Sequence, residues 1–486
     1  MTMANRRPGL HVQGMSLHIP FDNSYARLPG TFFTEQAPTP VAAPRLVAFN
    51  EPLARLMGIS PGEVEEMAQV FAGNRVPDGA APLAQAYAGH QFGNFNPQLG
   101  DGRAVLLGET VGTDGKRRDL QLKGSGPTPY SRMGDGRAWL GPVLREYVVS
   151  EAMHALGIPT TRALAAVETG EPVVREEVLP GAVLARVASS HLRVGTFQIF
   201  AARRESDSLQ RLTQYAIDRH YPHADGPMGL LAAVRDAQVR LIVQWLSVGF
   251  IHGVMNTDNC AISGETIDYG PCAFLDTYHP ETVFSSIDRD GRYAYFRQPD
   301  IAVWNLAQFA TALIQQLDDP EAAIEEASDI VNSMPELIRA EWRRVFCAKI
   351  GIAAPRDADV GMAVDLLKRM AENQADFTNT FRALSDGAPR DQFVDPEAFD
   401  QWAEPWRARL AEEQDPQAVM RAANPVLIPR NHRIEAMIAA AVDGDYAPFE
   451  RLMAACARPF AADEAFADLR RPPAVDEKVQ ATFCGT

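Results

Sequence analysis

The strongest constraint on the fold is a change in the spacing of apolar residues along the chain, from the alternation typical of strands to the spacing typical of helices. Residues 104–111 and 118–123 alternate as strands do, and the sequence Gly-Thr-Asp-Gly between them, at 112–115, is typical of a hairpin turn. In the second arm the leucines fall on one face, while an aspartate, a glutamine and a lysine fall on the other. A helix then opens near Pro142 and ends before Gly157.

Strand patterns then give way to helical ones. Residues 162–188 read as strands, which we expect to be broken at 169–171, where the sequence is Thr-Gly-Glu. Helical patterns dominate from Phe197 onward, and the apolar runs at 241–250 and 301–313 predict buried helices. The order predicts an α+β chain with a protein kinase-like two-lobed fold: a β-rich N-lobe with one key helix, a mainly helical C-lobe, and extensions at both ends.

Four parts are expected on this plan. Residues 1–85 form an N-terminal extension packed on the core, and residues 86–195 form the kinase-like N-lobe. Residues 196–420 form the helical C-lobe, and residues 421–486 form a C-terminal helical segment and tail. The same order places a short hairpin at 262–267, after the buried helix.

Composition narrows the partners and the compartment. The formal net charge of −16 argues against nucleic acid or an anionic membrane as the main partner. The chain has no run of about 18 apolar residues that would predict a membrane span. No apolar segment follows Arg6 and Arg7 as it would in a secretory signal. The cysteines show no C-x-x-C pair or zinc-like spacing, so a cytoplasmic location is the simplest expectation.

The sequence Gly-Asp-Gly-Arg occurs twice, at 100–103 before the first strand of the hairpin and at 134–137 before the helix. Glycines let backbone N–H groups approach a phosphate closely, and an adjacent arginine adds charge and a forked donor. A single copy is most often an ordinary turn. Because the sequence occurs twice, once just before a strand and once just before a helix, an ordinary turn and a phosphate-binding loop are both possible interpretations.

Lys123 ends the second strand of the hairpin, and Glu146 lies one turn into the following helix. In kinases a strand lysine contacts the nucleotide phosphates and is oriented by a glutamate from the next helix. A surface ion pair is the alternative and would contribute little. The order of elements favours the kinase-like interpretation.

A third candidate follows the buried helix. Residues 252–259 include Asp258 and Asn259, and Asp268 begins an Asp-Tyr-Gly sequence nine residues later. Mg²⁺ prefers hard oxygen ligands such as a carboxylate and an amide, and a free carboxylate suits a proton acceptor. Asp258 and Asn259 are adjacent, which departs from the kinase H-R-D-x-x-x-x-N pattern. His252 is expected to be a packing residue.

At these residues the chain resembles the selenoprotein O family of kinase-like protein adenylyltransferases, and it looks like a bacterial member that carries cysteine. The matching strings are 23–29, 87–93, 97–103, 121–137, 252–259, 268–271 and 424–432.

The resemblance assigns roles residue by residue. It implies a first nucleotide loop at Gly100, Gly102 and Arg103, and a second at Asp135 and Gly136. Lys123, held by Glu146, would contact the phosphates. Arg186 and Arg193 would reach the phosphate tail, although no local pattern prefers them to other arginines. Asp258 would be the proton acceptor, and Asn259 and Asp268 the ligands of Mg²⁺ or Mn²⁺.

The resemblance further implies that ATP binds in reverse relative to kinases. AMP would then pass to Ser, Thr or Tyr hydroxyls of proteins, and pyrophosphate would leave. Transfer of UMP from UTP with Mn²⁺ stays open, as do two competing functions: a conventional protein kinase and a silent nucleotide-binding pseudokinase scaffold. Cys484, third from the end, stands where eukaryotic relatives carry selenocysteine, and the family's regulatory bond implies a disulfide between Cys272 and Cys484 as a hypothesis.

Overall fold

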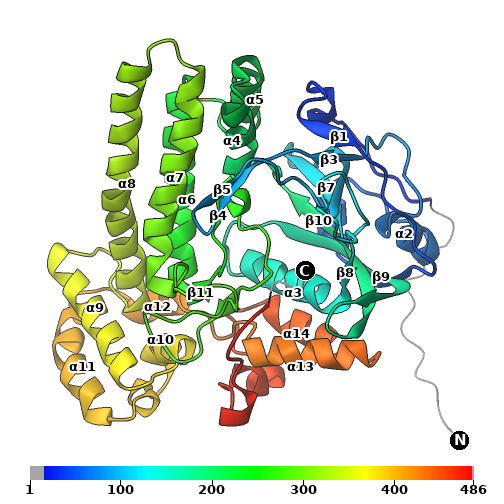
Figure 1. The fold of residues 1–486 in the computed structure, drawn as a ribbon. Helices are drawn as coiled ribbons and strands as arrows, with labels where there is room; N and C mark the ends of the chain where they lie inside the picture. Colours follow the sequence, from blue (N-terminus) through cyan, green and yellow to red (C-terminus); the bar gives the residue numbers. More distant parts are fainter. Residues whose placement is uncertain (1–15, 484–486) are drawn as a thin grey trace, which may run out of the picture.

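The computed structural model describes residues 16–483, which form a β-rich lobe followed by a helical lobe (Figure 1). The strands of the main sheet are β1 (Phe33–Glu35), β2 (Arg45–Phe49), β3 (Leu83–Gln85), β6 (Ala104–Val111), β7 (Arg117–Lys123), β8 (Ala138–Trp139), β9 (Arg162–Val174) and β10 (Val178–Ala188). They form an eight-stranded antiparallel sheet in the order β1-β3-β6-β7-β10-β9-β2, and β8 pairs with β10. β1, β2 and β3 belong to this sheet although they come from the predicted N-terminal extension.

The predicted hairpin is confirmed as β6 and β7. Its tip, Gly115, has a φ of +73°, which glycine adopts without strain. Leu120 and Leu122 are fully buried against a core cluster that includes residues of α1 (Glu51–Leu56) and α2 (Val64–Phe71). The opposite face of β7 carries polar side chains toward the junction of the lobes, as its alternation predicts.

The expected break at 169–171 is wrong. β9 runs through these residues, and the chain turns at 175–177 instead. Pro172 pairs with Pro180 and Glu168 with Ala182, so three residues of β9 oppose Gly181 alone. Gly170 has a φ of +71°, and a Cβ there would lie 2.6 Å from that of Ala43. A Thr-Gly-Glu sequence therefore forms a bulge within a long strand.

α3 (Leu140–Ala155) is the predicted N-lobe helix, and it packs under the sheet (Figure 1). The helices α13 (Asn431–Val442) and α14 (Ala447–Cys456) cover its other side. Arg145 of α3 pairs with Glu435 of α13, and Tyr147 meets Phe449 of α14 edge-on at 5.6 Å. The C-terminal segment therefore belongs to the surroundings of the N-lobe helix.

The helical lobe consists of two groups. The first stands beside the sheet and contains α4 (Val194–Arg203), α5 (Ser206–His220), α6 (Gly226–Ser247), α7 (Gln298–Leu313) and α8 (Pro320–Lys349). The second has its own core and contains α9 (Asp357–Glu372), α10 (Phe377–Asp386), α11 (Pro396–Leu410) and α12 (Pro416–Ala423).

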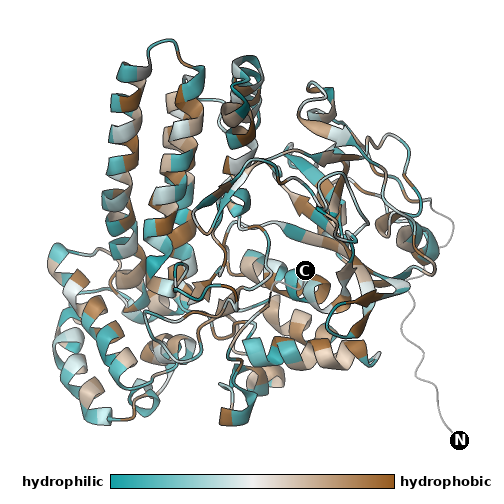
Figure 2. Ribbon diagram, viewed as in Figure 1, coloured by the Kyte–Doolittle hydropathy of each residue, from teal (hydrophilic) through white to brown (hydrophobic). Residues whose placement is uncertain are grey.

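In the helical lobe, the buried residues are mostly the apolar ones. The two predicted runs, which lie mainly in α6 and α7, are largely buried, although Trp304 is half-buried and Thr311 is exposed. α8, at the edge of the first group, alternates hydrophobic and hydrophilic residues (Figure 2). Within residues 16–483, no helix combines the length and the apolar character that crossing a membrane requires.

Two short pairs of strands lie at the junction of the lobes. β4 (Gly89–Gln91) and β5 (Asn94–Asn96) form a hairpin in front of the helices, and β11 (Phe250–Ile251) pairs with β12 (Ala273–Phe274) (Figure 1). The hairpin expected at 262–267 is wrong, because this segment pairs with other parts of the chain. Ala261 bridges Arg193, and Thr266 bridges Thr160. These bridges join the segment before Asp268 to Thr160, which precedes β9, and to Arg193, which precedes α4.

Candidate active site

A cavity of about 630 Å³ lies where the sheet meets the helical lobe. Every predicted site residue except Glu146 lines it: Gly100, Gly102, Arg103, Lys123, Asp135, Gly136, Arg186, Arg193, Asp258, Asn259 and Asp268. Residues separated by up to 168 positions in the chain are therefore brought to one cavity wall.

Lys123 stands at the centre of an ionic cluster. Its Nζ donates to Glu146 Oε2 at 2.6 Å and to Asp268 Oδ1 at 2.7 Å. Arg186 also donates to both carboxylates, at 3.1 Å to Glu146 and 2.6 Å to Asp268. Burial alone would raise the pKa of the Asp268 carboxyl, but the surrounding cations, including Arg193, outweigh burial and hold that pKa well below its usual range. Glu146 thus acts on the cavity through Lys123 and Arg186.

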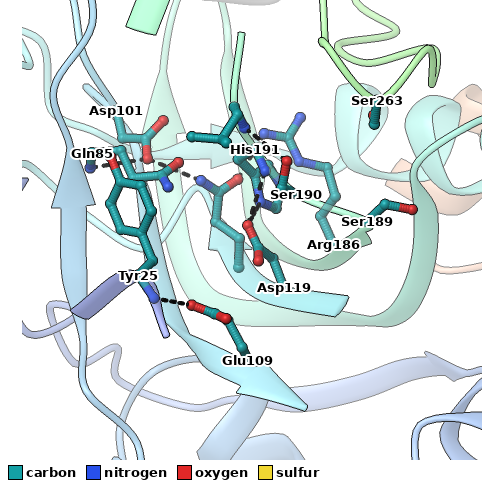
Figure 3. A network of polar contacts seen from close by, with 12 residues as sticks. Tyr25, Gln85, Asp101, Glu109, Asp119, Arg186, Ser189, Ser190, His191 and Ser263 are labelled. Carbon is teal, nitrogen blue, oxygen red and sulfur yellow. Dashed lines mark hydrogen bonds and ion pairs between the residues drawn. The ribbon is translucent and has the colours of Figure 1, made fainter. Parts of the chain in front are cut away.

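Gln121 connects the cations to the first glycine loop. Its Oε1 accepts from Arg186 Nη2 at 2.7 Å, and its Nε2 donates to Asp101 Oδ2 at 3.0 Å. Two residues earlier on the same face of β7, Asp119 accepts from the backbone N–H of His191 at 2.9 Å, and Figure 3 shows this pair beside Asp101 and Arg186. The polar face of β7 therefore positions charged groups along its length.

The two arginines retain unused donors. Arg186 Nε and Arg193 Nε are buried and find no hydrogen-bond partner among the described residues. Arg193 stacks over the Tyr87 ring at 4.4 Å and lies 3.7 Å from Asp101. Buried guanidinium donors without partners are costly, and an anionic oxygen entering the cavity would satisfy them. This part of the cavity fits a phosphate group.

The glycine loops are shaped by close packing. Gly100 has a φ of +100°, and a Cβ there would lie 2.4 Å from the Tyr130 ring. Gly136 has a φ of +66°, and a Cβ there would lie 2.1 Å from the carbonyl oxygen of Gly126. Arg175 holds the second loop by donating to both oxygens of Asp135, at 2.8 and 3.0 Å. These hydrogen bonds lower the pKa of Asp135. A side chain larger than a hydrogen atom would not fit at Gly100 or at Gly136.

Asp258 lies in the short 3-10 helix η2 (Thr257–Asn259) and is clamped by the β4–β5 hairpin. Its Oδ2 accepts from Gln91 Nε2 at 3.1 Å. Its Oδ1 is buried, and among the described residues it has no hydrogen-bond partner. Burial raises the pKa of Asp258 to about 6, so the group is mostly ionised at neutral pH yet more basic than an exposed aspartate. These are the properties of a proton acceptor.

Two oxygens fit a divalent cation. Asn259 Nδ2 donates to the Val254 carbonyl at 3.0 Å, which leaves Oδ1 as the free acceptor of that amide. Asp268 binds its cations through Oδ1, and its backbone sits in the left-handed region at a φ of +65°. Within residues 16–483 there is no cluster of three or more His, Cys, Asp or Glu side chains that would hold a metal. A cation here would use the amide, the carboxylate and oxygens from a nucleotide or water.

His252 is confirmed as a packing residue. It is fully buried, its ring stacks 5.3 Å from that of Trp245, and its Nε2 lies 2.8 Å from the Ile267 carbonyl oxygen. Cys272 is also buried, and the Thr482 hydroxyl donates to the carbonyl of the neighbouring Pro271 at 2.5 Å. Cys484 lies outside the described residues, so its pairing with Cys272 stays a prediction.

Sequence reasoning missed several residues of the site. Gln121 had a usable signal, because it shares a strand face with Lys123. Asp101 sits inside the first glycine loop, but no role was predicted for its side chain. Gln91 and Tyr87 had no local signal, since their partners Asp258 and Arg193 lie more than 100 residues away.

Comparison with known proteins identifies the family. The family model described as protein adenylyltransferase SelO matches residues 15–457. The chain is similar to the protein nucleotidyltransferase YdiU of Ruegeria pomeroyi, with 73% identity over 97% of this chain and 100% of that protein. It is also similar to YdiU of Roseobacter denitrificans (68%) and of Bradyrhizobium diazoefficiens (57%), again over 97% of this chain and 100% of each relative. This chain belongs to the SelO family of protein adenylyltransferases.

Proposed function

We propose that the chain transfers AMP from ATP to Ser, Thr or Tyr hydroxyls of proteins and releases pyrophosphate. The observation that carries the proposal is the charge of the most buried part of the cavity wall. Arg186 and Arg193 are each 2% exposed, and both retain an unused Nε donor. An adenine ring has no charge to pair with these groups, whereas a triphosphate has several. The triphosphate of ATP therefore binds in the deeper part of the cavity, and the adenosine binds near the cavity entrance.

This orientation determines which phosphorus meets the acceptor. With the β- and γ-phosphates against Lys123, Arg186 and Arg193, the α-phosphorus lies on the side of Asp258. Asp258 accepts the proton of the substrate hydroxyl, whose oxygen bonds to the α-phosphorus as the bond to pyrophosphate breaks. The cations stabilise the charge that develops on the leaving pyrophosphate, and they are already oriented by Glu146 and Gln121.

Mg²⁺ or Mn²⁺ fits this site: Asn259 and Asp268 would hold the metal, which would neutralise phosphate charge there. UTP in place of ATP, with Mn²⁺, stays an alternative nucleotide. We further propose that the two lobes have a protein kinase-like fold. The order of strands and α3, together with the Lys123–Glu146 pair, supports this assignment.

ATP labelled on either the α- or the γ-phosphate tests the proposal. The protein is incubated with an acceptor protein and each label, with Mg²⁺ or Mn²⁺, and labelled UTP is included. Labelling from α and not from γ supports AMP transfer, whereas labelling from γ alone restores a conventional kinase. Absence of metal-dependent labelling favours a silent scaffold. Asp268→Ala should abolish labelling, and Asp290→Ala, which removes an exposed carboxylate outside the cavity, should not.

A further inference from the structure

The β4–β5 hairpin is attached to the segment that carries Asp258. Besides the Gln91 bond to the carboxylate, the N–H of His90 donates to Thr257 Oγ1 at 2.7 Å. The N–H of Phe92 donates to Asn256 Oδ1 at 3.1 Å. The hairpin is also exposed, with Phe95 43% accessible. A protein that presents a hydroxyl to Asp258 therefore has to lie along this hairpin.

Arg292 lies at the turn of the hairpin. A Cβ built on Gly93 would be 3.8 Å from its guanidinium carbon, which also stacks 4.9 Å from the Trp304 ring. The next residue, Tyr293, donates through its hydroxyl to Asn256 Oδ1 at 2.7 Å. Arg292 is thus tied to the catalytic segment through its neighbour. It is not among the residues that line the nucleotide cavity.

The guanidinium of Arg292 lacks an acidic partner. Asp288, on the same loop, accepts instead from the backbone N–H groups of Arg292 and Tyr293, at 2.9 and 2.8 Å. Among the described residues Arg292 forms no ion pair with a carboxylate; its guanidinium hydrogen-bonds the Tyr293 hydroxyl, and its Nε is buried without a partner. Stacking on Trp304 fixes the plane of the guanidinium. A planar guanidinium that no carboxylate neutralises is suited to bind one through two parallel hydrogen bonds.

We propose that Arg292 is a subsite for a carboxylate of the protein substrate, an Asp or Glu side chain close in sequence to the modified hydroxyl. The inference rests on the proposed AMP transfer and adds a substrate preference to it. Because the pairing would be local, the net charge of −16 on the whole chain does not oppose it.

Acceptor peptides test the subsite. Each peptide has one central Ser, Thr or Tyr and one Glu, Gln or Lys at a single position within four residues on either side. Initial rates of α-phosphate labelling are measured with wild type, Arg292→Gln, Arg292→Glu and Arg289→Glu. Arg289 is an exposed residue of the same loop, so its substitution changes the net charge of the loop equally and serves as the control. Thermal unfolding and the KM for ATP show whether each variant is folded and binds nucleotide.

Wild type is expected to label the Glu peptide about five- to ten-fold faster than the Gln peptide at one or two positions. Arg292→Gln should remove this preference, Arg292→Glu should turn it toward Lys, and Arg289→Glu should keep it. Equal labelling of Glu and Gln peptides by wild type, or an unchanged Glu preference in folded Arg292→Glu, overturns the subsite while leaving AMP transfer intact. If wild type labels no peptide and no protein from the α-phosphate, the proposed function fails and the subsite fails with it.

Discussion

Replacing Gly89 by alanine puts a methyl group against the carboxylate of Asp258. The new Cβ would lie 2.8 Å from Asp258 Oδ1 and 3.0 Å from its Cβ, where ordinary contact begins at 3.4 Å. Gly89 does not have a positive φ, so alanine introduces no backbone strain of its own. The overlap is removed only if the carboxylate or the hairpin moves by about 0.6 Å, the difference between 3.4 and 2.8 Å.

A displacement of this size is costly for a group that takes a proton. Misplacing a reacting group by about 1 Å costs roughly 10²-fold in rate, so about 0.6 Å corresponds to a loss of about ten- to thirty-fold in kcat, or about 1.4–2 kcal/mol. The cations proposed to bind phosphate, Lys123, Arg186 and Arg193, are not among the atoms that a Cβ at Gly89 would meet, so the KM for ATP should stay within about two-fold of wild type. The kcat and the KM are measured from the rate of α-phosphate labelling of an acceptor protein at varied ATP.

Gly361→Ala is the matched control. Gly361 lies within α9, and a Cβ there meets nothing within 4 Å. This variant should keep the wild-type rate and gain up to about 1 kcal/mol of stability from the helix propensity of alanine. A Gly89→Ala protein with wild-type kcat and unchanged thermal unfolding would refute the argument that the hairpin determines the position of Asp258.

Three further substitutions test other parts of the structure. Gln121→Leu removes the hydrogen-bond partner of Arg186 Nη2 and Asp101 Oδ2, so the KM for ATP should rise about ten-fold. An unchanged KM would show that Arg186 keeps its orientation without Gln121. Arg175→Gln frees Asp135 and should raise the KM for ATP about three- to ten-fold with little change in kcat. Equal losses of kcat and kcat/KM would argue against a role in binding alone. Burial lowers the pKa of Lys349 from 10.5 to about 7 in the folded protein. Between pH 7 and 10.5 the unfolded chain therefore binds this proton more tightly than the folded protein does. The free energy of unfolding should then rise with pH in this range, by up to about 1.4 kcal/mol per pH unit. Lys349→Met should lose this part of the pH dependence in urea unfolding at pH 7.5 and 9.5, and identical slopes for both proteins would contradict it.

Local patterns predicted much of the scaffold. The alternation in β7 placed Lys123 on the polar face, and the termination signals after α3 marked where that helix ends. The pairing of Glu146 with Lys123 then follows from the position of Glu146 in α3, because the strand and the helix are consecutive and must pack together. The pairing at 2.6 Å is therefore the part of the site that sequence reasoning reached without any relative.

Contacts between distant segments were out of reach. Gln91 and Asp258 are 167 residues apart, and nothing near either residue indicates the other. The Thr-Gly-Glu sequence at 169–171 has turn composition, and only its register against β10 shows that it is a bulge. Arg186 was indistinguishable from other arginines until its cross-strand neighbour Gln121 was known.

The covering of α3 by α13 and α14 has a consequence for control of the enzyme. In kinases, movement of the helix that carries the glutamate breaks the lysine–glutamate pair and switches catalysis off, and under the proposed kinase-like fold that helix is α3. Here α13 and α14 of the same chain pack against that helix, through the Arg145–Glu435 ion pair and the Tyr147–Phe449 contact. The family match extends to residue 457, just past α14, so these two helices are part of the shared unit. We therefore expect these contacts to hold α3, and with it the Lys123–Glu146 pair, in place, and we expect a shortened chain that ends before α13 to lose this support.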